Sequence, residues 1–152
     1  MTETAHLILG AAIASKMPNP ILASILAVGS HIILDIVPHW DTGTNWRKRS
    51  VKKTVLYTGI DLGLGTAIGL VLFAKTTPLP YLLFIMFLST LPDWLEAPYF
   101  FGFKIPPFSS IYKIQHILHK KKQLPWGLIT QLAFLAVLLF ILFLPSLSAL
   151  AK

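Results

Sequence analysis

The chain has 152 residues, of which 55% are hydrophobic and only 12% charged, and it contains no cysteine. Because soluble domains carry about 25% charged residues, this composition disfavours a disordered chain, a secreted disulfide scaffold and an ordinary water-soluble enzyme. The mean hydropathy of +0.69 indicates an integral membrane protein, and the formal net charge of +7 raises the question of nucleic acid or anionic lipid as a partner.

Six helical segments are predicted along the chain. They cover residues 4–16, 20–37, 52–74, 79–97, 109–122 and 125–144. The second, third, fourth and sixth segments have about the length that crosses the hydrocarbon core of a bilayer, whereas the first is short for a crossing. The fifth alternates isoleucine and leucine with polar residues, which is typical of an amphipathic helix on a membrane surface. The sequence therefore predicts one all-α membrane domain, a polytopic bundle of about five membrane helices and one surface helix.

Basic residues gather on one side of this predicted topology. Ten of the 13 Lys and Arg residues lie in the loop after residue 40, including Arg47 and Lys48, and in the stretch 98–124. The positive-inside rule makes that side cytoplasmic and places the N-terminus inside a prokaryotic cytoplasmic membrane. The positive charge is then explained by topology, so we expect membrane lipid as a partner and no nucleic acid.

An internal repeat is indicated by a shift of 60 residues, which aligns residues 18–40 with 78–100 without a gap. Three of the identities are prolines at matching helix ends. We interpret 4–40 and 52–100 as two duplicated helical hairpins that are followed by a C-terminal span. Chance similarity between two proline-bounded apolar helices is the alternative explanation.

Four of the six acidic residues lie inside the apolar segments, namely Asp35, Asp61, Asp93 and Glu96. An ionisable side chain at the centre of a bilayer costs about 3 kcal/mol on insertion scales, so these carboxylates need partners. Because no Lys or Arg lies away from the ends of these segments, the available partners are histidines or a bound cation.

The histidines and acids share helix faces. His31, Asp35 and His39 follow at intervals of four, and the pairs Asp93–Glu96 and His116–His119 are three apart. Carboxylate and imidazole groups at such spacings on facing helices build metal sites in bundles. In the predicted topology these residues gather in or at the rim of the cytoplasmic half of the membrane. The candidate metal ligands are His6, His31, Asp35, His39, Asp61, Asp93, Glu96, His116 and His119.

Several of these candidates also have ordinary structural explanations. Asp61 could form a hydrogen bond between helices, and Asp93 with Glu96 could cap helix ends near the interface. His116 and His119 lie beside three lysines, which is typical of a helix that faces lipid headgroups.

Short motifs connect these residues with known families. TAHLILGAAIA (4–14) and LPDWLEAP (91–98) resemble motifs of the bacterial membrane-bound metal-dependent hydrolase family. SHIILDIVPHWD (30–41) is similar to the His-x-x-x-Asp element of zinc-dependent phospholipase C and P1-type nucleases, in which His and Asp bind zinc. The hydrolase family's second histidine motif is absent, and His116 and His119 are the candidates to replace it. The resemblance implies as ligands His6, His31, Asp35, His39, Asp93 and Glu96.

The expected function is a membrane-embedded hydrolase that uses a divalent metal, preferably zinc but also manganese or iron. Asp93 or Glu96 is the expected general base. The expected substrate is a phosphate-bearing amphiphile, such as a phospholipid, that enters from the cytoplasmic leaflet. The alternative is a non-enzymatic membrane protein, either a structural or partner-binding protein or a conduit for metal ions or protons.

Overall fold

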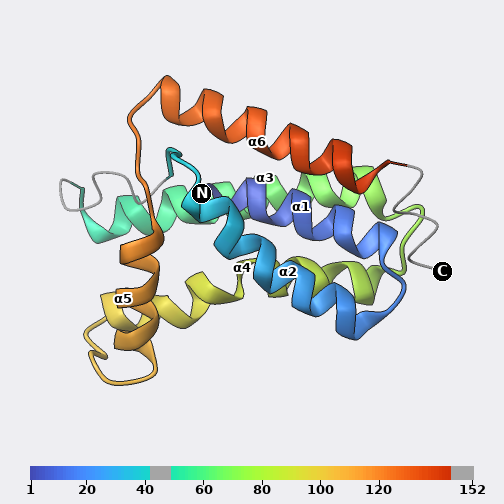
Figure 1. The fold of residues 1–152 in the computed structure, drawn as a ribbon. Coiled ribbons are helices and arrows are strands. Elements are labelled where there is room, and N and C mark those ends of the chain that lie inside the picture. The colour runs from blue at the N-terminus through green and yellow to red at the C-terminus, as the bar shows by residue number, and fades with distance from the viewer. Residues whose placement is uncertain (42–48, 145–152) are drawn as a thin grey trace.

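The computed structural model describes residues 1–41 and 49–144, which form six α-helices (Figure 1). Arg47 and Lys48, which contribute to the predicted basic loop, lie outside the described residues. The prediction of an all-helical chain is confirmed. The helices are α1 (Glu3–Lys16), α2 (Pro20–Ile36), α3 (Val51–Phe73), α4 (Leu79–Phe100), α5 (Phe108–Leu118) and α6 (Trp126–Leu142).

Local sequence explains where the helices begin and end. The side chain of Asn19 accepts hydrogen bonds from the first backbone N–H groups of α2, and Pro20 starts that helix with a favourable φ. Ser50 caps α3 in the same way. Pro38 follows the end of α2, so His39 lies in extended chain beyond the helix.

Helix α1 lies inside the bundle and packs against α2, α3, α4 and α6 (Figure 1). Nine of its 14 residues are buried. Glycines permit the close approach, because a Cβ on Gly65 of α3 would lie 2.6 Å from the Cα of Thr4, and one on Gly10 would lie 2.5 Å from the Oγ of Ser89. The position of His6 in α1 is therefore fixed by backbone-to-backbone packing.

The prediction of five membrane helices in two hairpins and a C-terminal span is wrong. Among the described residues, only α3 is both long and apolar enough to cross a membrane. Helices α2 and α6 are apolar but have 17 residues each, and α4 contains two internal prolines as well as two acids. Hydropathy misled the prediction at α1, because a helix that is apolar on all sides is also what the core of a bundle requires.

Helix α5 lies at one end of the bundle, runs across the direction of the other helices and contacts α4 and α2 (Figure 1). The second half of α4, which contains Pro92 and Pro98, bends towards it. The helix ends at Leu118, four residues earlier than predicted, because the chain beyond it pairs with another segment. The backbone N–H of His39 donates to the carbonyl of Lys120 over 3.1 Å, and that of Lys122 donates to the carbonyl of His39 over 2.6 Å.

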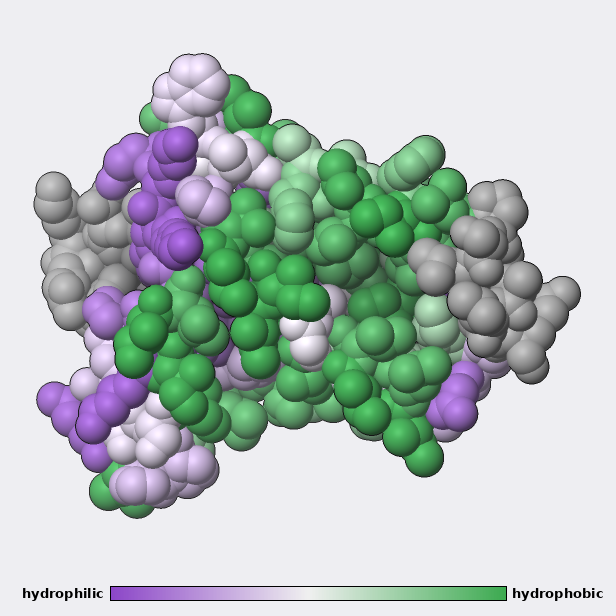
Figure 2. Space-filling model, in the orientation of Figure 1, coloured by the Kyte–Doolittle hydropathy of each residue, from purple (hydrophilic) through white to green (hydrophobic). Residues whose placement is uncertain are grey.

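The exterior of the bundle is strongly apolar. Apolar residues cover the middle of the face in Figure 2, and hydrophilic residues gather at the end that carries α5 and the N-terminus. On α3, Leu64 is 54% exposed and Val71 is 79% exposed. Soluble monomers rarely expose apolar residues that adjoin one another over a large part of a face.

Candidate metal centre

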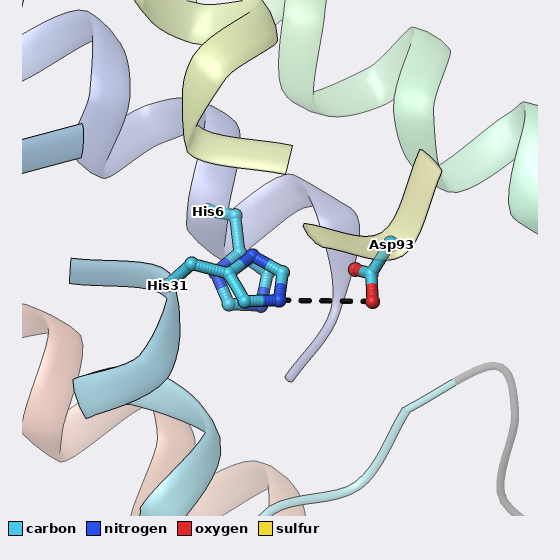
Figure 3. A group of neighbouring side chains, drawn as sticks. All are labelled: His6, His31 and Asp93. Atoms are coloured by element: carbon cyan, nitrogen blue, oxygen red, sulfur yellow. Dashed lines mark ion pairs between the residues drawn. The ribbon is translucent and has the colours of Figure 1, made fainter. Parts of the chain in front are cut away.

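Three side chains from different helices form a first ligand group: His6 of α1, His31 of α2 and Asp93 of α4 (Figure 3). One potential ligand atom of each lies within 4.8 Å of those of the other two. The two imidazole rings stack with their centroids 4.0 Å apart, and the Nε2 of His31 lies 3.6 Å from Oδ1 of Asp93. Helix packing thus brings together residues that are up to 87 positions apart in the chain.

A second ligand group consists of Asp35, His39 and His119. Asp35 lies in the last turn of α2, and the two histidines lie just beyond the ends of α2 and α5. The Nε2 of His119 is 2.5 Å from Oδ2 of Asp35, and the Nε2 of His39 is 3.9 Å from Oδ1. The backbone pairing between the segments after α2 and α5 holds these two histidines beside each other.

Asp35 connects the two groups. Its Oδ2 lies 3.1 Å from the Nε2 of His31, and its Oδ1 lies 3.3 Å from the Nε2 of His6. The terminal amino group of Met1 also contacts Oδ1. One carboxylate therefore lies within reach of histidines from both ligand groups.

Backbone carbonyls orient two of the histidines. The Nδ1 of His31 lies 2.8 Å from the carbonyl oxygen of Ser89, and the Nδ1 of His39 lies 2.7 Å from that of Val37. A carbonyl can only accept, so in each ring Nδ1–H donates and Nε2 is directed towards the carboxylates. Metal-binding histidines in proteins are commonly oriented by such a hydrogen bond.

Four of the six ligand side chains are shielded from solvent, whereas the side chain of Asp93 is 28% exposed and that of His119 is 14% exposed. His6 and His39 are 0% exposed, His31 is 1% exposed and Asp35 is 2% exposed. Burial, together with the neighbouring His31, lowers the pKa of His6 to about 3. Burial opposes the protonation of His31, but Asp93 and Asp35 outweigh this effect and raise its pKa to about 10. His6 is thus a neutral imidazole, which is the form that binds metal ions, whereas His31 carries a proton that it would have to release to bind one.

These residues fit a divalent metal ion. The Nδ1 of His6 has no hydrogen-bond partner within the described part of the chain, and the Nε2 has only the Asp35 carboxylate nearby, at 3.3 Å, although the ring is completely buried. A buried polar atom without a partner is costly, and coordination to a cation would satisfy it. Four imidazoles and two carboxylates without thiolates suit zinc, manganese or iron. The buried His and Asp groups could therefore hold a metal ion, as predicted.

Asp61 belongs to α3 and lies away from both ligand groups, beside the first turn of α1. Its carboxylate accepts hydrogen bonds from the backbone N–H of Glu3 (2.9 Å) and Thr4 (3.0 Å) and from the Thr4 hydroxyl (2.6 Å). Asp61 therefore caps a neighbouring helix from within α3, which agrees with the alternative of a hydrogen bond between helices.

Two other predicted ligands are outside both groups. His116 is exposed and stacks on Tyr112, with ring centroids 5.6 Å apart. Glu96 lies almost one turn beyond Asp93 on α4, and burial together with Asp93 raises its pKa to about 8. Their participation in a metal site stays a prediction.

Asp93 has two polar neighbours that were not among the predicted site residues. The Nε2 of Gln115 donates to Oδ1 of Asp93 over 3.3 Å. Glu3 also lies beside Asp93, and burial followed by the charge of Asp93 raises the pKa of Glu3 well above its usual value. Helical spacing could have found both residues, because Glu3 precedes His6 by three positions and Gln115 precedes His119 by four.

Comparison with protein-family models, with curated proteins and with solved structures finds no match to this chain.

Proposed function

We propose that this protein is a membrane-associated, metal-dependent hydrolase that acts on a phosphate-bearing amphiphile. The observation that carries the proposal is the pair of buried ligand groups joined at Asp35. The motif resemblances support the same class of reaction. Two adjacent groups with a carboxylate between them are suited to one or more divalent cations, with zinc preferred and manganese or iron as alternatives.

A divalent metal ion would supply Lewis-acid charge for a phosphoryl oxygen and would make water a better nucleophile at neutral pH. The residues of both ligand groups would hold it. We assign Asp93 to the ligands because it lies against His31, and Glu96 to the role of general base. A carboxyl with a pKa of about 8 can exchange a proton near neutral pH.

Membrane association is supported by α3 and by the apolar exterior. Helix α3 has 23 residues and is long enough to cross a bilayer. The second ligand group includes His119, which directly follows α5 at the hydrophilic end of the bundle and is itself followed by three lysines. We propose that this end faces the cytoplasm, in keeping with the positive-inside rule, and that the substrate is reached from the cytoplasmic leaflet.

A non-enzymatic metal-binding protein is the second candidate, and the burial of the ligands favours it, because structural metal sites are closed whereas catalytic sites keep an open position. The cavity beside the ligands argues for catalysis. It has a volume of about 210 Å³, and its lining includes His31, Asp35 and His119.

The test is metal content by plasma mass spectrometry on the detergent-purified protein, the His31→Ala, Asp35→Asn double variant and the His116→Ala variant. We expect stoichiometric metal in the first protein, loss of metal in the double variant and retention in His116→Ala. Metal-loaded protein is then assayed on phospholipid and phosphodiester substrates, with Glu96→Gln as the inactive comparison. Absence of metal after reconstitution would refute the proposal, and bound metal without hydrolysis would favour the structural candidate.

A further inference from the structure

The cavity beside the metal centre has two kinds of wall. It lies between α2, α4 and α5, and most of its lining is aliphatic. The polar residues of the lining are His31 and Asp35 in the last two turns of α2, and Gln115 and His119 at the end of α5 or just beyond it. The principal aliphatic residues are Val28, Ile32, Leu91, Leu95, Ile114 and Leu118.

Along α2, the lining of the cavity changes from aliphatic to polar towards the end of the helix. On α2 the lining runs from Val28 to Asp35, a rise of about 10 Å at 1.5 Å per residue. On α5 and just beyond it, the lining runs from Ile111 to His119. The contact between Asp35 and His119 is thus at the polar end of the cavity, where a bound molecule meets the Asp35 carboxylate and the imidazoles of His31 and His119.

The aliphatic part of the cavity reaches the outside of the bundle. Ile32 is 42% exposed, Leu95 is 38% exposed and Ile114 is 57% exposed, so these residues belong both to the lining and to the apolar exterior. A ligand that is dissolved in lipid could therefore enter from the side without crossing water.

We propose that this cavity binds the alkyl chain of a single-chain anionic amphiphile from the surrounding lipid, with its phosphate group at the ligand groups. This assignment rests on the proposed function and names its substrate class. The volume of about 210 Å³ is somewhat larger than the apolar cavity of about 150 Å³ that holds benzene, which suits one short alkyl segment and not two chains. Lys120 and Lys122, which are exposed beside His119, add positive charge for the phosphate.

The first part of the test uses Co²⁺-loaded protein in lipid nanodiscs and alkylphosphonates with one, four and eight carbons. The visible spectrum of Co²⁺ reports phosphonate binding at the metal, and empty nanodiscs correct for partition into lipid. We expect the affinity to rise about fourfold for each methylene that the cavity takes up. We also expect Ile114→Trp to reduce octylphosphonate binding at least tenfold and to leave methylphosphonate binding unchanged.

The matched control is Ile117→Trp, on the same helix, because Ile117 is 80% exposed and does not line the cavity. It should bind both phosphonates as the unmodified protein does. Equal losses in the two tryptophan variants would contradict the assignment.

The second part locates the chain without using the metal. An octylphosphonate with a terminal diazirine is photoactivated, and labelled residues are mapped by mass spectrometry. Labels on Leu95 or Ile114 that disappear in Ile114→Trp support the assignment. A Co²⁺ response to methylphosphonate with labels confined to residues outside the cavity would overturn the assignment and leave the proposed function intact. Failure to bind Co²⁺ would instead refute the proposed function, and with it the position of the phosphate group.

Discussion

Removal of the Asp61 carboxylate should destabilise the protein without affecting metal binding at the candidate centre. Asp61 accepts three hydrogen bonds of 2.6–3.0 Å from the first turn of α1, two of them from backbone N–H groups. Loss of a helix cap costs about 1 kcal/mol, and each buried donor left without a partner adds about 1 kcal/mol or more. We therefore expect Asp61→Ala to lower the free energy of unfolding by about 3 kcal/mol.

The assay is thermal unfolding followed by circular dichroism in detergent, combined with metal analysis of the same samples. For a chain of this length, about 3 kcal/mol corresponds to a decrease in Tm of roughly 6–12 °C. Asp61→Asn keeps one acceptor and should lose about half as much, and both variants should retain metal. A Tm within 2 °C of the unmodified protein in Asp61→Ala would refute the capping role. Loss of metal from a fully folded Asp61→Asn variant would show that Asp61 is a ligand.

Three other predictions follow from the packing and the surface. Gly65→Ala should lower Tm by several degrees, because its Cβ would meet Thr4, whereas Gly63→Ala has open space and should be neutral or slightly stabilising through helix propensity; thermal unfolding of both variants decides this. Lys121→Ala should change the free energy of unfolding by less than about 1 kcal/mol, because Lys121, which pairs with Asp41 over 3.1 Å, has a side chain that is 35% exposed to solvent. A larger loss of stability in chemical denaturation would contradict this. Leu64→Asp, on the exposed side of α3, should cost about 3 kcal/mol or more in bilayer insertion, measured as protein released by carbonate extraction; unchanged retention would argue against α3 as a membrane helix.

The sequence was sufficient to predict where the helices lie in the chain, but not whether each helix is enclosed by other helices or exposed on the outside of the bundle. The predicted boundaries of α2 and α3 differ from the observed ones by one residue, because Asn19, Ser50 and Pro38 act locally. Hydropathy could not show that α1 is enclosed by its neighbours, since lipid and a protein core favour the same side chains. The count of membrane helices was therefore wrong although the helices themselves were present.

For the candidate site, too, the sequence predicted which residues share a helix face but not which residues of different helices meet. Intervals of four predicted that His31 and Asp35 share a face, and the structure places them 3.1 Å apart. The choice between His116 and His119 depends on where α5 ends, and that end is set by the backbone pairing of Lys120 with His39, 81 positions away. Nothing local could show that Asp61 points to α1 while Asp93 points to His31.

The order in which the ligand residues occur in the chain has a consequence for biosynthesis. The first ligand group is complete once residue 93 has been made, whereas the second requires His119 and the pairing of Lys120 and Lys122 with His39. Chains synthesised from the N-terminus acquire their contacts in that direction. A nascent chain of this protein thus passes through a stage at which the residues of the first ligand group can meet while Asp35 still lacks His119, so the two groups can form in succession and not together.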